Sequence, residues 1–465
     1  MKKTLSVLLA VCLCVLCGCN AVRTESSQTT PQTTQTPLES TDNTVPSTVL
    51  QTSPETTEAT VPETAPPTEP ETTGSTEPAV HPGKIQDMKA LWISQFDMAQ
   101  VYLDGNTQRS QEDFTARMSQ ILDNVKSQTF NTVFLQIRPY GDSMYPSQVY
   151  PSSACVAGET GGQLQYDPVS IIVSLARQRG LSIHAWINPL RCMKDTEIGL
   201  VSTDYAIGRW YQDPQLNGKY LVLVNGRWYL NPAYEEVTEL ICAGAQETMQ
   251  LYDFDGLHLD DYFYPTTDTS FDADAYSAYQ AAGGQYSLAD FRRDNINRLV
   301  LSLYELTHDS RSDRLFGISP GGNIDTTYNS QYADVYQWCS KPGYVDYLCP
   351  QVYWGLEHQT HHFVKVCKTF QGIMKEDSVA LIIGMTFGKA YSLEDQWAGT
   401  GKDEWKNHKD ILARCLRATL ELESCRGVSI FCYQYFFDPL TGQSVSETAQ
   451  ERENFMELFE TITWN

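Results

Sequence analysis

The stretch from residue 254 to residue 265 carries the densest group of chemically competent side chains in the sequence. It reads FDGLHLDDYFYP and places His258, Asp260 and Asp261 at the end of an apolar run. Glycoside hydrolysis uses two carboxyl groups, one protonated to assist the leaving oxygen and one ionised as nucleophile or base. Asp260 is therefore the first catalytic candidate. Asp261 is a second, although a cap of the following loop would suit it too, and regular strand alternation would point it away from Asp260.

The partner carboxyl group is less evident from the sequence. Further acidic residues that follow predicted strands are Asp97, Asp142 and Glu357. Among them we choose Glu357, after the sixth predicted strand, as the expected catalytic partner of Asp260.

Amide, basic and aromatic side chains follow the other strand ends. Sugar hydroxyls need directional polar partners, and the apolar face of a pyranose packs on Trp or Tyr, so the set favours a carbohydrate ligand. Any single aromatic residue could instead be barrel packing. The predicted substrate-binding residues are Arg138, Trp186, Asn188, His258, Tyr262, Gln351, Tyr353, Trp354 and Tyr433. We expect neither a metal ion nor another cofactor.

Eight apolar runs alternate with amphipathic helical patterns, which is typical of parallel βα units. The runs are near-continuous in hydrophobicity, as strands buried on both faces should be. They span residues 90–96, 132–138, 182–188, 256–262, 315–319, 347–353, 380–385 and 427–433. The predicted fold is α/β, a single (β/α)8 TIM barrel with long βα loops. In such barrels the active site lies at the carboxyl ends of the strands.

One insertion after the third predicted strand reads as a β-hairpin. Residues 220–224 and 227–230 flank the turn Asn225-Gly226, a strong hairpin signal. We expect this hairpin to cover part of the cleft. The nine cysteines from Cys155 to Cys432 are dispersed without metal-ligand spacing, so we expect mostly buried free thiols.

The N-terminal part differs from the barrel in composition. Residues 1–19 resemble a lipoprotein signal peptide whose apolar run is too short to span a bilayer, with Cys19 as the lipidated residue. Residues 20–85 are a Thr/Pro/Glu-rich linker expected to be disordered, and residues 86–465 form the barrel. We thus expect an exported protein, lipid-anchored to the outer face of the cytoplasmic membrane in the cell envelope. The net charge of −24 argues against nucleic acid as a partner.

The motif from Asp255 to Pro265 resembles the fourth strand of the glycosyl hydrolase-like 10 family of exported bacterial proteins. Five more motifs resemble that family in order: KALW from Lys89, QIRP from Gln136, AWINP from Ala185, FGISP from Phe316 and PQVYW from Pro350. The resemblance implies a (β/α)8 fold and a glycosidase that acts on a poly- or oligosaccharide of the cell envelope or exterior, such as the glycan strand of peptidoglycan. Gly321 and Gly322 replace an expected bulky residue, which predicts a wider subsite there.

Three alternative functions use the same side chains. A metal-dependent polysaccharide deacetylase could employ six residues: His258, Asp260, Asp261, His358, His361 and His362. A non-catalytic glycan-binding surface lipoprotein would need the aromatic rim without Asp260. A transglycosylating enzyme would share every residue with a hydrolase.

The lipid anchor can be tested through Cys19. Cys19 is the expected attachment point of the lipid, so Cys19→Ala should release or mislocalise the protein. Metabolic labelling with an alkyne fatty acid should mark the wild type alone. Equal labelling of both proteins would show that this cysteine is not the lipidation site.

Overall fold

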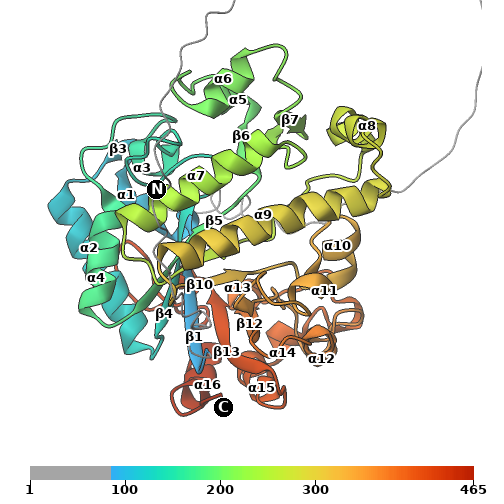
Figure 1. Cartoon of the computed structure of the whole chain (residues 1–465). Coiled ribbons are helices and arrows are strands. Elements are labelled where there is room, and N and C mark those ends of the chain that lie inside the picture. The colour runs from blue at the N-terminus through green and yellow to red at the C-terminus, as the bar shows by residue number, and fades with distance from the viewer. Residues whose placement is uncertain (1–84, 465) are drawn as a thin grey trace, which may run out of the picture. The chain divides into compact units, whose positions relative to one another are not determined.

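Eight parallel strands close into a barrel within residues 85–464, which are the residues that the computed structural model describes (Figure 1). Around the barrel the order is β1-β13-β12-β11-β10-β9-β5-β4. The strands are β1 (Met88–Ile93), β4 (Thr132–Arg138), β5 (Ser182–Ile187), β9 (Gly256–Leu259), β10 (Leu315–Ile318), β11 (Tyr347–Leu348), β12 (Ala380–Thr386) and β13 (Cys425–Phe431). The predicted (β/α)8 fold is confirmed.

Some strands end earlier than the sequence predicts, because polar side chains at their carboxyl ends take over backbone hydrogen bonds. After β1, Ser94 and Asp97 form a capping box that begins helix α1 (Gln95–Tyr102) where the sequence predicted strand. Beyond β9, the Asp260 carboxylate accepts the N–H of Asp261 at 2.8 Å, and the chain leaves the sheet before Tyr262.

The barrel wall separates two apolar clusters. Inside it, Trp92, Phe134, Trp186, Tyr347 and Ile382 pack with one another and with smaller side chains. The outward-facing residues of the same strands pack against the surrounding helices in a second, larger cluster. Both faces of each strand are therefore buried, which explains why the strands read as continuous apolar runs.

Helices follow the strands and cover the outside of the barrel. The long ones are α2 (Gln111–Ser127), α4 (Pro168–Gln178), α7 (Glu235–Leu251), α9 (Leu288–Ser310), α12 (Phe363–Ile373) and α16 (Ala449–Phe459). Shorter elements are α3 (Ala154–Ala157), α8 (Ala273–Ala281), α10 (Ile324–Asn329), α11 (Val335–Trp338), α13 (Gly388–Ser392), α14 (Glu404–Asn407), α15 (Ile411–Thr419), and the 3-10 turns Thr269–Asp272, Gly399–Gly401 and Tyr433–Tyr435. Helix α4 begins as its sequence predicts, with the Asp167 side chain accepting the N–H of Ser170 and Pro168 in the first turn.

The insertion after β5 forms a separate three-stranded sheet (green in Figure 1). Its strands are β6 (Arg191–Lys194), β7 (Leu221–Val224) and β8 (Arg227–Leu230), with helices α5 (Asp195–Ile198) and α6 (Ala206–Gln212) between β6 and β7. Positive φ values of 50° at Asn225 and 77° at Gly226 make the tight turn that joins β7 to β8. The predicted hairpin is confirmed. A small sheet of β2 (Leu103–Asp104) and β3 (Thr107–Gln108) follows α1.

Several N-terminal predictions lie outside the described residues. These are the signal peptide, the lipidation site Cys19 and the linker up to residue 84. Within residues 85–464, no helix has the length and apolarity needed to cross a membrane. The nine cysteines of this region are all free, and seven of them are buried, as the sequence predicts.

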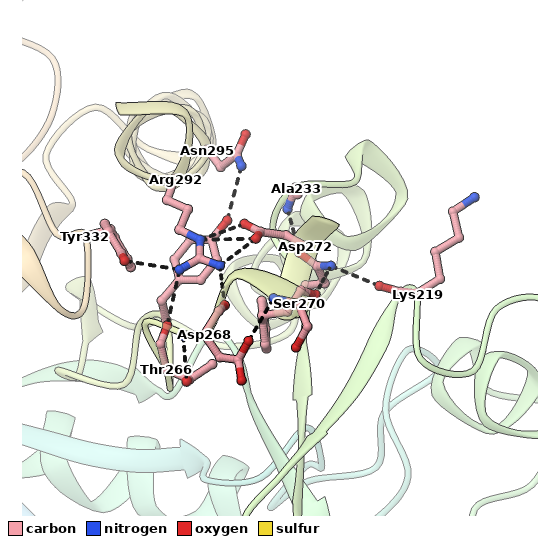
Figure 2. A network of polar contacts seen from close by, with 12 residues as sticks. Lys219, Ala233, Thr266, Asp268, Ser270, Asp272, Arg292, Asn295 and Tyr332 are labelled. Atoms are coloured by element: carbon pink, nitrogen blue, oxygen red, sulfur yellow. Dashed lines mark hydrogen bonds and ion pairs between the residues drawn. The ribbon is translucent and has the colours of Figure 1, made fainter. Parts of the chain in front are cut away.

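The long loop after β9 is fastened to helix α9 by a buried ion pair (Figure 2). The Arg292 guanidinium donates to both oxygens of Asp272, at 2.6 to 3.1 Å, and to the backbone oxygen of Asp268 at 2.6 Å. It also donates to the Tyr332 hydroxyl at 3.1 Å and lies over the rings of Tyr264 and Tyr332. Both charged side chains are fully buried, so water cannot take the place of either one if the other is removed. The ion pair therefore holds the loop against α9.

Removing Arg292 should destabilise the fold strongly. Arg292→Ala leaves Asp272 buried without a counter-charge, which costs about 3–5 kcal/mol of unfolding free energy. Urea unfolding followed by circular dichroism measures the loss. The control is Arg298→Ala on the same helix, whose ion pair with Asp294 is solvent-exposed and worth less than about 1 kcal/mol. Equal unfolding midpoints for the two variants would contradict the structural role of the buried pair.

Candidate active site

The Asp260 carboxylate, 6% exposed, lies at the carboxyl end of β9 and accepts hydrogen bonds from four N–H groups. Its Oδ2 accepts from the Trp186 Nε1 at 3.2 Å and from the Asn188 Nδ2 at 2.9 Å. Its Oδ1 accepts from the Asp261 backbone N–H at 2.8 Å and from the Gln351 Nε2 at 3.2 Å. Four N–H donors fix the carboxylate in place. The structure thus brings Trp186, Asn188 and Gln351 together around Asp260.

A chain of amides orients these donors. The backbone N–H of Gln95 donates to the Gln136 Oε1 at 2.9 Å, and the Gln136 Nε2 donates to the Asn188 Oδ1 at 2.8 Å. A backbone N–H can only donate, so the atom of Gln136 that faces it must be the amide oxygen. The Gln136 nitrogen then faces Asn188, whose amide oxygen must accept from it. Asn188 is left with its N–H group directed at Asp260. The Gln351 Nε2 is fixed in a similar way by the Ser319 carbonyl at 3.0 Å.

Regular strand alternation predicted that Asp261 would point away from Asp260. In the structure the two side chains lie beside each other. The strand ends at Leu259, so alternation no longer applies, and the two carboxyl groups are hydrogen-bonded to each other. Burial, then the Asp260 charge and the hydrogen bond to it, raise the pKa of Asp261 well above its ordinary value. Gln351 also hydrogen-bonds to Asp261. The raised pKa favours the protonated form of the Asp261 carboxyl group beside Asp260.

Below the carboxylates, His258 occupies the barrel floor and does not face the mouth. It is fully buried, and its Nε2 accepts from the Trp92 Nε1 at 3.4 Å and lies 3.1 Å from the Ser319 Oγ. Its Nδ1 lies 2.9 Å from the Tyr347 hydroxyl, which also lies 2.9 Å from the His184 Nδ1. Burial lowers the pKa of His258 well below 6.5. The predicted contact between His258 and substrate is thus replaced by a supporting position under Asp260.

Two other predicted binding residues point into the layer of helices. Arg138, 4% exposed, lies over the Tyr150 ring at 4.6 Å, and a Cβ at Gly244 of α7 would fall 2.5 Å from its Nη1. A bulge in the pairing of β4 with β5 accompanies this outward turn. Tyr433 is fully buried and accepts a hydrogen bond from Asn124 of α2 at 2.9 Å. Both residues support the barrel wall in this structure.

The carboxyl groups considered as partners of Asp260 are engaged elsewhere. The Glu357 side chain is 51% exposed and its Oε1 lies 3.7 Å from the His408 Nε2. Asp97 accepts the backbone N–H groups of Ser94 and Gln434, both at 2.6 Å. Asp142 accepts the N–H of Tyr140 at 2.8 Å, and burial raises its pKa to about 6. Among the described residues, Asp261 is therefore the carboxyl group that hydrogen-bonds to Asp260.

Aromatic residues after β11 line the other side of the mouth. Tyr353 packs on Phe431 with ring centroids 5.8 Å apart, and Trp354 stacks on His361 at 4.5 Å. A Cβ at Gly322 would lie 2.6 Å from the Trp354 ring. The absence of a side chain at Gly322 leaves the space that the Trp354 ring occupies. The ring thus takes up the room that the sequence assigned to a wider subsite at this point.

The sheet inserted after β5 adds two arginines to the site. Arg191 lies over the Tyr262 ring at 4.1 Å and the Tyr140 ring at 5.0 Å, and Arg227 lies over Tyr140 at 4.5 Å. The sequence prediction did not include Arg227 among the binding residues. Its place directly after the Asn225-Gly226 turn of a hairpin expected to cover the cleft was the available signal.

The side chains considered for a metal site do not converge. His258 has its ring nitrogens hydrogen-bonded within the barrel floor, while His361 stacks on Trp354. His358 accepts the backbone N–H of His361 at its Nδ1, and His362 is the residue directly before α12, where its side chain makes no capping hydrogen bond. No cluster of three or more metal-ligating side chains occurs within residues 85–464.

The chain is similar to known proteins over most of its length. The chain is 28% identical to the glycosyl hydrolase DigH of Escherichia coli (strain K12) over 390 residues, which cover 78% of this chain and 86% of the relative. It is 27% identical to the glycosyl hydrolase YngK of Bacillus subtilis, with coverage of 67% and 62%. The catalytic domain of a β-amylase from Paenibacillus polymyxa shares the fold, with a TM-score of 0.51, 10% identity and coverage of 80% of this chain and 99% of that one.

The family model for glycosyl hydrolase-like 10 matches residues 87–399, more than half of the chain. This match spans seven of the eight barrel strands, from β1 to β12, together with Asp260, Asp261 and their hydrogen-bond donors. With a closed (β/α)8 barrel and a carboxyl pair at its mouth, the chain belongs to the glycosyl hydrolase-like 10 family.

Proposed function

We propose that this protein is a glycoside hydrolase of the cell surface. Its substrate would be a glycan of the cell envelope, such as the glycan strand of peptidoglycan, or an extracellular polysaccharide, and a lipid on Cys19 would anchor it. The observation that carries the proposal is the carboxyl pair. Asp261, whose raised pKa favours its protonated form, would supply the acid, and the adjacent Asp260 would supply the negative charge that glycosidic cleavage needs.

In this proposal the two carboxyl groups have different tasks. Asp261 is partly exposed and gives its proton to the leaving oxygen. Asp260, held by four donors, keeps its charge and stabilises the positive charge that develops on the sugar ring. Aromatic side chains at the mouth, including Tyr353 and Trp354, would pack against pyranose rings.

The closeness of the pair has a mechanistic consequence. Carboxyl groups that flank a glycosidic bond lie about 5–5.5 Å apart in retaining enzymes and about 6.5–9.5 Å apart in inverting ones. Asp260 and Asp261 are directly hydrogen-bonded, so in this proposal they act from one side of the bond. Water or a substrate group would attack from the other side. A role for Glu357 as base stays a prediction, and it requires its side chain to leave His408.

Kinetics of single variants should separate the two tasks. Asp260→Asn removes charge stabilisation and should lower kcat by about 10³-fold, or roughly 4 kcal/mol, with little change in KM. Asp261→Asn should lower kcat about 10²-fold or more on a natural glycan, yet much less on an aryl glycoside whose leaving group needs no proton. Release of reducing ends and of aryl alcohol are the measurements.

The matched control is Asp325→Asn, which removes an exposed carboxylate from α10 after the neighbouring strand β10. It should leave turnover unchanged. Near-wild-type hydrolysis of a natural glycan by both Asp260→Asn and Asp261→Asn would refute the assignment.

The pH profile provides an independent check. If Asp261 works protonated, activity falls as pH rises through its raised pKa. The charge of Asp260 contributes to the raised pKa of Asp261. Asp260→Asn should therefore lower the Asp261 pKa and move the alkaline limb of the residual activity to lower pH. An alkaline limb at the same pH in both proteins would contradict Asp261 as the acid.

A further inference from the structure

Two guanidinium groups flank one aromatic ring at the mouth of the barrel. Arg191, at the start of β6, and Arg227, at the start of β8, lie on Tyr140 with 5.0 and 4.5 Å from guanidinium carbon to ring centroid. Strand β6 pairs with β8 in the inserted sheet, so both arginines belong to one rigid element. Stacking on a ring leaves the in-plane N–H groups of an arginine free to bind a ligand.

Neither arginine has an acidic partner. No carboxylate within residues 85–464 forms an ion pair with Arg191 or Arg227, and the Nε of Arg191 is buried without a hydrogen-bond acceptor. Arg227 donates one N–H to the backbone oxygen of Cys192 at 2.5 Å. Burial and the nearby charge of Arg191 lower the pKa of Arg227. The two half-buried guanidinium groups repel each other, and no ion-paired carboxylate of residues 85–464 offsets that repulsion.

The arginine pair adjoins the catalytic carboxyl groups. The guanidinium carbon of Arg191 lies 4.1 Å from the ring centroid of Tyr262, the residue directly after Asp261. The charge of Asp260 also acts on Arg191 and helps to raise its pKa. A sugar placed for cleavage at Asp261 would therefore carry its substituents past Arg191. The unfilled donors point to an anionic group on that sugar or on the one next to it.

We propose that Arg191 and Arg227 form a subsite for a carboxylate carried by the glycan substrate. A carboxylate accepts two parallel N–H groups from a guanidinium, which gives both affinity and orientation. This inference rests on the proposed glycosidase function and adds the class of substrate, an acidic glycan. Its charge would offset the repulsion between the two arginines, so the subsite would select acidic over neutral glycans.

Binding to the Asp260→Asn variant tests the subsite without turnover. The first probe is soluble, peptide-free peptidoglycan glycan with free lactyl carboxylates, compared with the same glycan after amidation. The second is oligogalacturonate compared with its methyl ester. Calorimetry should show at least one acidic probe binding about tenfold or more tighter than its neutral form, because a charge-assisted pair of hydrogen bonds is lost. The pair that shows the preference identifies the source of the carboxylate.

Variants locate the preference. Added to Asp260→Asn, either Arg191→Gln or Arg227→Gln should reduce the acidic-over-neutral preference about tenfold. Lys194→Gln is the control, because it removes the same charge from β6 at an exposed position paired only with Glu197. Equal affinity for acidic and neutral forms of both probes, or a preference that survives in both arginine variants, would overturn the subsite.

Hydrolysis by the wild-type protein distinguishes a failure of the subsite from a failure of the proposed glycosidase function. Equal hydrolysis of acidic and neutral glycans would overturn the subsite and leave the glycosidase intact. The protein could also bind an acidic probe preferentially and release no reducing ends from it. That result would contradict the proposed glycosidase function and the placement of the subsite beside a catalytic centre.

Discussion

A negative charge at the mouth of an apolar barrel needs donors that are already in place, and Asp260 obtains them from three separate strands. Trp186 and Asn188 come from the end of β5, Gln351 follows β11, and the N–H of Asp261 comes from the chain after β9. These segments meet because the barrel closes. The position of the carboxylate thus depends on the register of the whole sheet, and the amide chain from Gln95 carries that dependence to β1 and β4.

The architecture was predictable because its signals are local. Strands buried on both faces read as apolar runs, the cap at Asp167 and Pro168 marks the start of α4, and Asn225-Gly226 marks a tight turn. The same double burial conceals which side chains point into the barrel. Arg138 was predicted at the mouth because it ends a strand, yet the bulge beside it turns the guanidinium outward onto Tyr150.

The candidate site was predictable only in part for a related reason. Asp260 and its donors follow strand ends, so their convergence follows from a parallel barrel. The relation of Asp261 to Asp260 depends on where β9 ends, and a side chain of the loop itself decides that. Arg227 was missed because its role comes from Tyr140 and Arg191, which approach it only when the inserted sheet folds over the mouth.

The histidines of the barrel floor have a consequence for how the candidate site should respond to pH. Burial lowers the pKa of His184 to about 4 and that of His258 well below 6.5, so both rings are neutral at neutral pH. The Tyr347 hydroxyl between them stays protonated as well, since burial raises its pKa well above 10. The barrel floor therefore carries no titrating charge near neutral pH, and a moderate change of pH alters the charge of the candidate site through the groups at the mouth.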